Sequence, residues 1–333
     1  MTTPSSAANS SHLPDVSVIL PILNEELYLR DSITSILSQD YLGKFEVILA
    51  VGPSHDRTLE IARDLAREDT RVVVIENPTG RTAAGLNLAL AASVSEYVIR
   101  VDGHSEIPRN YISLAIEILQ RTGAVNVGGV MAAVGVTPFE VAVAGAMRSP
   151  LGVGASRFHT GGEAGVVDTV YLGAFKRQAL VAIGGFDERF TRAQDWELNF
   201  RLRTNGGTIY FDPRLEVTYR PRSTVAALAK QYFEYGRWRR VVSRRHKGTM
   251  NYRYLAPPVA VAGFLTSLLM GALIHNIFYI PAGIYLFFVA AASIKIARSA
   301  AGYLYLLAII PTMHFAWGIG FITSPKSIVP SSD

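Results

Sequence analysis

The chain has 333 residues, no cysteine, and 32 Lys and Arg against 27 Asp and Glu. This length allows one large domain or two small ones with ample core. The absence of cysteine excludes a disulfide framework, a thiolate metal site and a cysteine nucleophile, and it fits a reducing, cytosolic surrounding. The net charge of +5 is mild, but the basic residues are unevenly spread along the chain.

Strands and helices alternate through the first hundred residues, after a small, polar stretch at 1–14 that we expect to be a disordered tail. Apolar runs rich in β-branched residues predict the strands, and helical periodicity predicts the segments between them. The predicted strands are 15–21, 45–51, 72–75 and 97–101, and the predicted helices lie within 22–41, 58–68 and 86–92. This alternation indicates βαβ units, a mostly parallel sheet and the α/β fold class.

The stretch YVIRVDGHSEIP, residues 97–108, is the centre of the predicted site. Its strand ends in Asp102, Gly103 and His104, at the edge where open α/β sheets bind ligands. Asp102 and His104 are candidate metal ligands, and Gly103 would let a phosphate or a metal approach the backbone. Asp and Gly are also common in plain turns, so this stretch alone leaves a turn equally open.

Polar residues also follow the first two predicted strands. Asn24 follows the first strand, and Ser54 and Asp56 follow the second. Each of these residues could simply cap the next helix. Because both sites follow successive parallel strands, they would lie at the same edge as Asp102, which favours ligand contact.

Two later segments are also functional candidates. The loop at 149–165 contains five glycines and is long for a routine connection, which suggests a mobile lid or an acceptor loop. Asp195 begins a predicted helix in the run AQDWELNFRLRTNGG. It is either an N-cap carboxylate or a general base that faces the same crevice as Asp102.

Three uncharged runs of membrane-spanning length lie near the C-terminus, at 255–274, 277–294 and 299–323. A basic cluster precedes them, formed by Arg237, Arg239, Arg240, Arg244, Arg245 and Lys247. Such a cluster could bind nucleic acid, but its place beside an apolar tail favours anionic lipid on the cytoplasmic side. Three crossings would then leave the C-terminus outside. A buried helical hairpin of a soluble protein is the weaker alternative.

Taken in order, several motifs resemble those of glycosyltransferase family 2, and most closely its membrane-anchored, succinoglycan-type bacterial members. The motifs are VSVILPILNEE, EVILAVGPSHDRT, VDGH, GGFDERF, AQDWELNFRL and QYFEYGRW, within about residues 15–245. The resemblance implies a GT-A fold, in which a Rossmann-like domain binds a nucleotide sugar. It also implies a divalent metal and an inverting mechanism.

The resemblance further implies roles for individual residues. Asp102 would be the first carboxylate of the DxD motif and would hold Mn²⁺ or Mg²⁺ against the donor diphosphate, and Asp195 would deprotonate the acceptor hydroxyl. The donor would be bound by Pro21, Asn24, Glu25, Val51, Ser54, Asp56, Arg81, Asp102 and Gly103. The acceptor or its diphosphate would contact Gln231, Arg237 and Trp238.

Two departures from the family pattern concern the donor and the metal. Val51 stands where most members have an Asp that contacts the nucleotide base. His104 replaces the second carboxylate of the DxD motif, and an imidazole ligand favours Mn²⁺ over Mg²⁺.

A third departure concerns the QxxRW motif. Gln231 precedes Arg237 by six residues, which puts the two on different faces of a helix. The helix must therefore bend near Gly236 if Arg237 is to reach the diphosphate. Trp238 would stack on the acceptor sugar or lie at the membrane interface.

We therefore expect a tail (1–14), a GT-A domain (15–224), basic juxtamembrane helices (225–254), a transmembrane region (255–323) and a second tail (324–333). The expected enzyme transfers a sugar, most readily from a UDP-sugar, to a lipid-linked acceptor of the polyprenyl diphosphate type. It would work at the cytoplasmic face of a bacterial inner membrane, without a nucleic-acid partner. The alternatives are a processive polysaccharide synthase, for which three spans are few, and a catalytically silent membrane tether.

Overall fold

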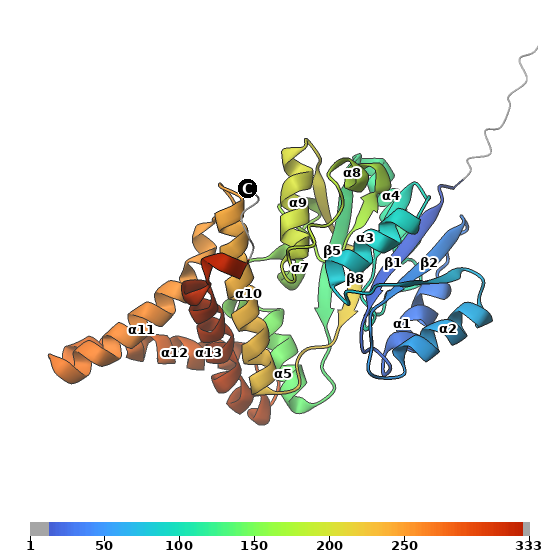
Figure 1. Ribbon diagram of the computed structural model, residues 1–333. Helices are drawn as coiled ribbons and strands as arrows, with labels where there is room; N and C mark the ends of the chain where they lie inside the picture. The colour runs from blue at the N-terminus through green and yellow to red at the C-terminus, as the bar shows by residue number, and fades with distance from the viewer. Residues whose placement is uncertain (1–12, 329–333) are drawn as a thin grey trace, which may run out of the picture.

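An eight-stranded sheet forms the centre of the molecule (Figure 1). The computed structural model describes residues 13–328, so the predicted tails at 1–14 and 324–333 lie largely outside the described residues. The strand order is β3-β2-β1-β4-β7-β5-β8-β6. The strands are β1 (Val16–Ile22), β2 (Phe45–Val51), β3 (Val72–Glu76), β4 (Tyr97–Arg100), β5 (Asn126–Ala133), β6 (Gly165–Val166), β7 (Ala174–Lys176) and β8 (Ile209–Tyr219).

The first four strands are parallel to one another, as the sequence predicts. β1 pairs in parallel with both β2 and β4, and β2 pairs in parallel with β3. Short strand β7 then joins the two halves of the sheet by pairing antiparallel with both β4 and β5. The predicted α/β class with a mostly parallel sheet is confirmed, whereas β5 and β8 are strands that the sequence analysis does not place.

Helices cover both faces of the sheet. Side chains that alternate along β1 and β2 point to opposite faces, so each face has its own apolar cluster. One face packs against α1 (Leu29–Leu37), α2 (Thr58–Glu68) and α4 (Tyr111–Thr122). The other face packs against α3 (Thr82–Ala92), α8 (Arg177–Ala182) and α9 (Gln194–Thr204).

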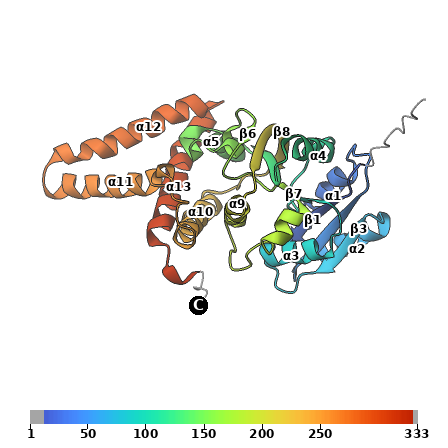
Figure 2. The same cartoon turned by 90° about the horizontal axis from the view of Figure 1, so that it is seen from above.

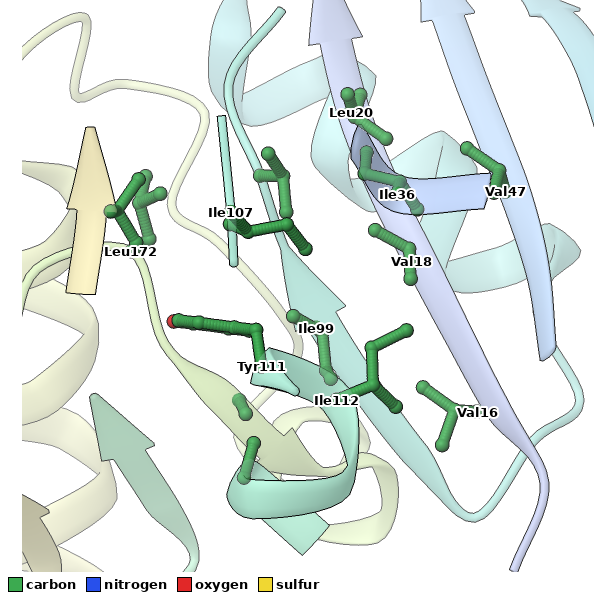
Figure 3. Close-up of a cluster of buried hydrophobic side chains, with 14 of the residues drawn as sticks. Val16, Val18, Leu20, Ile36, Val47, Ile99, Ile107, Tyr111, Ile112 and Leu172 are labelled. Atoms are coloured by element: carbon green, nitrogen blue, oxygen red, sulfur yellow. The ribbon is translucent and has the colours of Figure 1, made fainter. Parts of the chain in front are cut away.

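The first of these clusters holds the carboxyl end of β4 in place. Val18 and Leu20 of β1 and Ile99 of β4 are fully buried together with Ile36 of α1 and Ile112 of α4 (Figure 3). Burial of this kind contributes about 1.5–3 kcal/mol for each large apolar side chain. The residues that follow β4 are therefore presented from a rigid platform.

The C-terminal part consists of four long helices and short linking segments. They are α10 (Val225–Arg245), α11 (Ala256–Leu273), α12 (Ile280–Ile296) and α13 (Ala300–Thr323). α11 and α12 form a hairpin that projects away from the body, while α13 lies along α10 (Figures 1 and 2). Within residues 13–328, three helical segments are long and apolar enough to cross a membrane: Tyr252–Leu273, Asn276–Ile296 and Ala300–Thr323.

Helix α10 has no break at Gly236, where a bend is expected if Arg237 is to reach a diphosphate. A Cβ atom at Gly236 would overlap the carbonyl oxygen of Trp317 in α13. A Cβ atom at Gly320 would likewise overlap the carbonyl oxygen of Phe233. The two glycines therefore allow α10 and α13 to pack backbone against backbone.

Candidate active site

A cavity of about 1220 Å³ lies at the carboxyl ends of β1 and β4 and reaches across to α10. It is lined by most of the predicted donor and metal residues, namely Pro21, Asn24, Glu25, Asp56, Arg81, Asp102, Gly103 and His104. Val51 is not among the lining residues, because it is buried within β2 between Ile22 and Glu76. Ser54 does not line the cavity either, but its hydroxyl accepts a hydrogen bond from the N–H of Asn24 at 3.1 Å.

The loops after β1 and β2 are tied together at the cavity edge. Asn24 adopts a left-handed backbone with φ of 55°, and its Oδ1 accepts a hydrogen bond from the N–H of His55 at 2.9 Å. Asp56 accepts hydrogen bonds from the N–H groups of Thr58 and Glu26, at 3.0 and 3.2 Å. The N-cap of α2 is Arg57, so Asp56 is not its N-cap residue, but Asp56 accepts from the first N–H of that helix and also lines the cavity.

Arg100 connects the two carboxylates on which the predicted chemistry depends. Its Nη1 donates to Oδ1 of Asp195 at 2.5 Å, and its Nε and Nη2 donate to Oδ1 of Asp102 at 3.2 and 3.0 Å. The arginine side chain is only 7% exposed, so both contacts are largely shielded from water. The sequence analysis does not single out Arg100, although a charged residue in an otherwise apolar strand is a visible signal.

Asp195 is not among the residues that line the cavity, whereas the preceding Gln194 and its partner Arg100 are. It occupies the first turn of α9, and the N-cap position belongs to Ala193, so the N-cap alternative is wrong. Ala193 and Leu172 both adopt left-handed backbones, with φ of 60° and 57°, and the backbone of Leu172 hydrogen-bonds to the carboxylate. Such conformations are costly for residues other than glycine and cluster at functional sites.

The environment of Asp195 suits a group that takes up a proton near neutral pH. Burial raises the pKa of Asp195 to about 6, the positive charge of Arg100 opposes that rise, and the negative charge of Asp102 adds to it. A general base works best when its pKa is near the operating pH. The carboxylate of Asp195 can therefore accept a proton from a hydroxyl group at pH 7.

The metal ligands proposed from the sequence are only two in number. His104 Nδ1 lies 2.8 Å from Oε1 of Glu25, which leaves Nε2 toward other partners. A carboxylate behind an imidazole is the usual arrangement around metal-binding histidines. Among the described residues, no group of three or more His, Cys, Asp and Glu side chains could hold a metal ion. Asp102 and His104 therefore fit a cation that takes its other ligands from substrate phosphates and water.

The predicted acceptor residues do not line the cavity. Gln231 donates to the hydroxyl groups of Tyr219 and Tyr235, at 2.6 and 3.1 Å. Arg237 is paired with Glu234 at 2.8 Å. Trp238 is 5% exposed, packs against Phe190 and donates to Glu234, so its ring is covered by protein instead of being open to a sugar or to lipid.

Three other cations line the end of the cavity near α10. They are Arg192, Arg222 and Lys230, and all three are exposed. Within residues 13–328, none of their side chains forms an ion pair or a hydrogen bond, whereas neighbouring Arg220 is paired with Glu106 at 2.9 Å. Unpaired cations in a cavity are available to an anionic ligand.

The basic cluster at 237–247 is mostly engaged within the protein. The guanidinium of Arg239 lies between the rings of Trp196 and Tyr254, 4.0 and 3.9 Å from their centroids, and donates to the carbonyl of Thr249. Burial lowers the pKa of Arg239 to about 10. Trp196 follows Asp195 in the chain, so Arg239 ties the helix that carries this carboxylate to the C-terminal part. The prediction that the whole cluster faces lipid headgroups is therefore wrong for Arg239.

Comparison with known proteins supports the resemblance seen in the motifs. The family model described as "Glycosyl transferase family 2" matches residues 17–184. The succinoglycan biosynthesis protein ExoA of Rhizobium meliloti is 32% identical over 309 residues, which cover 91% of this chain and 93% of that protein. A dolichyl N-acetyl-α-D-glucosaminyl phosphate 3-β-D-2,3-diacetamido-2,3-dideoxy-β-D-glucuronosyltransferase of Methanococcus voltae is 26% identical over 76% of this chain and 80% of that protein.

Two solved structures share the fold. The mannosyltransferase PcManGT of Pyrobaculum calidifontis, solved with GDP-Man and Mn²⁺, gives a TM-score of 0.59 at 19% identity and covers 95% of this chain and 89% of its own. TarS 1–349 of S. aureus, solved with UDP, gives a TM-score of 0.51 at 16% identity over 91% and 90% of the two chains. The chain therefore belongs to glycosyltransferase family 2 and is a glycosyltransferase.

Proposed function

We propose that the protein transfers a sugar from a nucleotide diphosphate, with a UDP-sugar favoured, to a lipid-linked acceptor of the polyprenyl diphosphate type. The reaction would be inverting and metal-dependent, and it would serve cell-envelope or exopolysaccharide synthesis at the cytoplasmic face of a bacterial inner membrane. The observation that carries the proposal is the bridge from Arg100 to both Asp102 and Asp195 at the cavity. The bridge supports the proposal because it joins the candidate metal ligand Asp102 to the candidate base Asp195.

In the proposed reaction, the acceptor hydroxyl attacks the anomeric carbon of the donor sugar from the side opposite the diphosphate. The bond from that carbon to the phosphate oxygen breaks, and its electron pair leaves with the nucleoside diphosphate. The proton of the hydroxyl passes to the carboxylate of Asp195. Arg100 holds Asp195 in position and keeps it ionised until the proton arrives.

Asp102 and His104 would hold a divalent cation, Mn²⁺ or Mg²⁺. When bound, the cation neutralises charge on the departing diphosphate. Glu25 would orient His104 through the Nδ1 contact. Pro21, Asn24, Asp56 and Arg81 would border the nucleotide at the same end.

The acceptor would enter at the part of the cavity beside α10. Arg192, Arg222 and Lys230 would meet its phosphates, in place of Gln231, Arg237 and Trp238. The apolar side chains of Val134 and Val136 also line the cavity and are 50% and 76% exposed. A cationic site beside exposed apolar groups suits a phosphate that carries a lipid chain.

Thermal denaturation of the detergent-purified protein with UDP, GDP and other nucleotides, each with and without Mn²⁺, tests this proposal. Ligand binding to the native state raises the melting temperature by mass action. Stabilisation by UDP only when Mn²⁺ is present is the expected result. A preference for GDP would keep the enzyme but change the donor, and no shift with any nucleotide would favour the catalytically silent tether.

A further inference from the structure

Helix α13 is long and apolar enough to cross a membrane, but its contacts distinguish it from α11 and α12. In the most hydropathic stretch of α13, 39% of the residues are buried inside the protein, against 22% in each of the other two segments. Helix α13 packs against α10 and against α5 (Pro138–Met147), which follows β5 of the central sheet, as well as against α11 and α12. The apolar character of α13 is therefore partly explained by packing within the protein.

The beginning of α13 packs on the catalytic domain. The ring of Tyr305 meets the ring of Phe139 in α5 edge to face, with centroids 5.6 Å apart. Leu306, Ile309 and Ile310 are buried in one cluster with side chains of α5 such as Val143. The amino-terminal half of α13 is thus fixed beside the cavity-forming domain.

The end of α13 is held by α10. The hydroxyl of Ser324, just after the helix, donates to the carbonyl of Arg237 at 3.0 Å. Arg244 donates from Nη1 to the carbonyl of Pro325 at 3.1 Å. Both ends of α13 therefore contact the part of the protein that carries the active site.

Helix α10 itself belongs to that part and not to a bilayer core. Its Trp238 packs on Phe190 of the catalytic domain, and His246, at its end, lies 3.1 Å from Glu197 in α9. It also carries several arginines, which are costly in hydrocarbon. The carboxyl-terminal part of α13 lies beside this helix, with Trp317 against Gly236, so a crossing α13 would bring that part of α10 toward the hydrocarbon.

The geometry points to a two-span topology: we propose that α11 and α12 cross the membrane and that α13 lies along its surface on the catalytic side. A crossing α13 of 24 residues, about 36 Å long, would have its two ends on opposite sides of a hydrocarbon core about 30 Å thick. Its outward face, with Leu304 and Ile322 at 65% and 53% exposure, would instead rest in the lipid interface. The C-terminus then lies on the catalytic side, not on the far side as three crossings would require.

This arrangement also places the acceptor end of the cavity near lipid. α5 follows the cavity residues Val136 and Thr137 directly and packs on α13. A lipid-linked substrate could then reach the cations at that end without leaving the interface. The proposed topology depends only on membrane insertion of α11 and α12. It does not depend on the identity of the donor or of the acceptor.

The absence of native cysteine makes single-cysteine labelling a direct test. Three variants of the full-length protein, Lys247→Cys, Asn276→Cys and Ser327→Cys, introduce exposed thiols after α10, at the tip of the hairpin and after α13. A membrane-impermeant maleimide is applied to intact bacterial cells that express each variant, and again after lysis. We expect Asn276→Cys to react in intact cells, and Lys247→Cys and Ser327→Cys to react only after lysis.

Each other outcome has a distinct meaning. If Ser327→Cys reacts from the same side as Asn276→Cys, then α13 crosses and the proposal is wrong. The proposal also fails if Asn276→Cys and Lys247→Cys react from the same side, because the hairpin then does not cross. If Lys247→Cys and Ser327→Cys react in intact cells and Asn276→Cys reacts only after lysis, the two-span topology is still correct. Only the proposed cytoplasmic orientation is then wrong.

A depth measurement tests the lipid contact separately. Ala308 is exposed near the middle of α13, so a bimane on Ala308→Cys, in vesicles of phosphatidylglycerol and phosphatidylethanolamine, reports the depth of the helix. Stronger quenching by nitroxides near the lipid headgroups than by nitroxides at the chain ends is expected. Stronger quenching by chain-end nitroxides would indicate a crossing helix, and no quenching by either would show that protein, not lipid, covers this face.

Discussion

Arg100 donates a hydrogen bond of 2.5 Å from Nη1 to Oδ1 of Asp195, although 95 residues separate the two in the chain. The bond joins β4 of the central sheet to α9, which packs on the same face of the sheet as α3 and α8. Arg100 is the last residue of β4 and also bonds to Asp102, just after the strand, so one cation holds both carboxylates. This ion pair is the structural centre of the proposed mechanism.

Replacement of Arg100 tests this ion pair. Arg100→Met should lower the free energy of unfolding by about 3–5 kcal/mol, because it leaves buried carboxylates without their partner. It should also reduce kcat, and Arg100→Lys should restore part of the stability. Arg30→Met is a matched control, since Arg30 and Glu68 form an exposed pair whose loss costs about 0–1 kcal/mol. Equal melting temperatures for Arg100→Met and Arg30→Met would contradict the structural role of Arg100.

The pH dependence of turnover follows from the environment of Asp195. Burial raises the pKa of Asp195 to about 6, and only the ionised form can accept a proton. We expect kcat/KM to be level above that pH and to fall about tenfold per pH unit below it. Because the charge of Arg100 opposes protonation, Arg100→Met should move this limb to higher pH. A wild-type profile that stays level down to pH 5 would exclude Asp195 as the base.

The unpaired cations at the α10 end predict a selective effect on the acceptor. Arg222→Gln should raise the KM for a polyprenyl diphosphate acceptor by about ten- to a hundredfold, since a hydrogen bond to a charged group contributes about 1.5–3 kcal/mol. The KM for the nucleotide sugar should stay unchanged. Arg57→Gln, at an exposed arginine paired with Glu60, is the control and should change neither constant. A rise in the donor KM alone would assign Arg222 to the donor diphosphate.

The contact between α10 and α13 predicts a glycine-specific effect on stability. Gly236→Ala should destabilise the protein by about 1–3 kcal/mol, because the added methyl group meets the backbone of Trp317. Gly263→Ala in α11 is a close control, since a Cβ atom there has nothing within 4 Å. Thermal denaturation in detergent should separate the two variants, and identical curves would show that α10 and α13 do not pack this closely.

Most of the residues that line the cavity near the ends of β1 and β4 could be predicted from the sequence, because their placement depends on local patterns. The apolar strand that ends in Asp102 and the polar residues after β1 and β2 follow from strand periodicity and from the edge where parallel strands end. Val51 is the exception. Its side chain lies within the packed sheet, and a position in a motif does not reveal which way a strand residue points.

The acceptor end could not be predicted in the same way. Gln231, Arg237 and Trp238 share a motif-like run, but their partners come from elsewhere in the fold, such as Tyr219 and Phe190. Helix α10 continues unbroken through Gly236, and that glycine accommodates α13. Helix periodicity identifies a buried face, but it does not say what lies against it.

The most direct test of the central claim is sugar transfer by Asp195→Asn, measured together with binding of the nucleotide-sugar donor. Asparagine keeps the shape of the side chain but cannot accept the proton from the acceptor hydroxyl. We predict that kcat falls by about 10²–10⁴-fold while the donor still binds with nearly wild-type affinity. Turnover close to that of the wild type would contradict the account and remove Asp195 as the base.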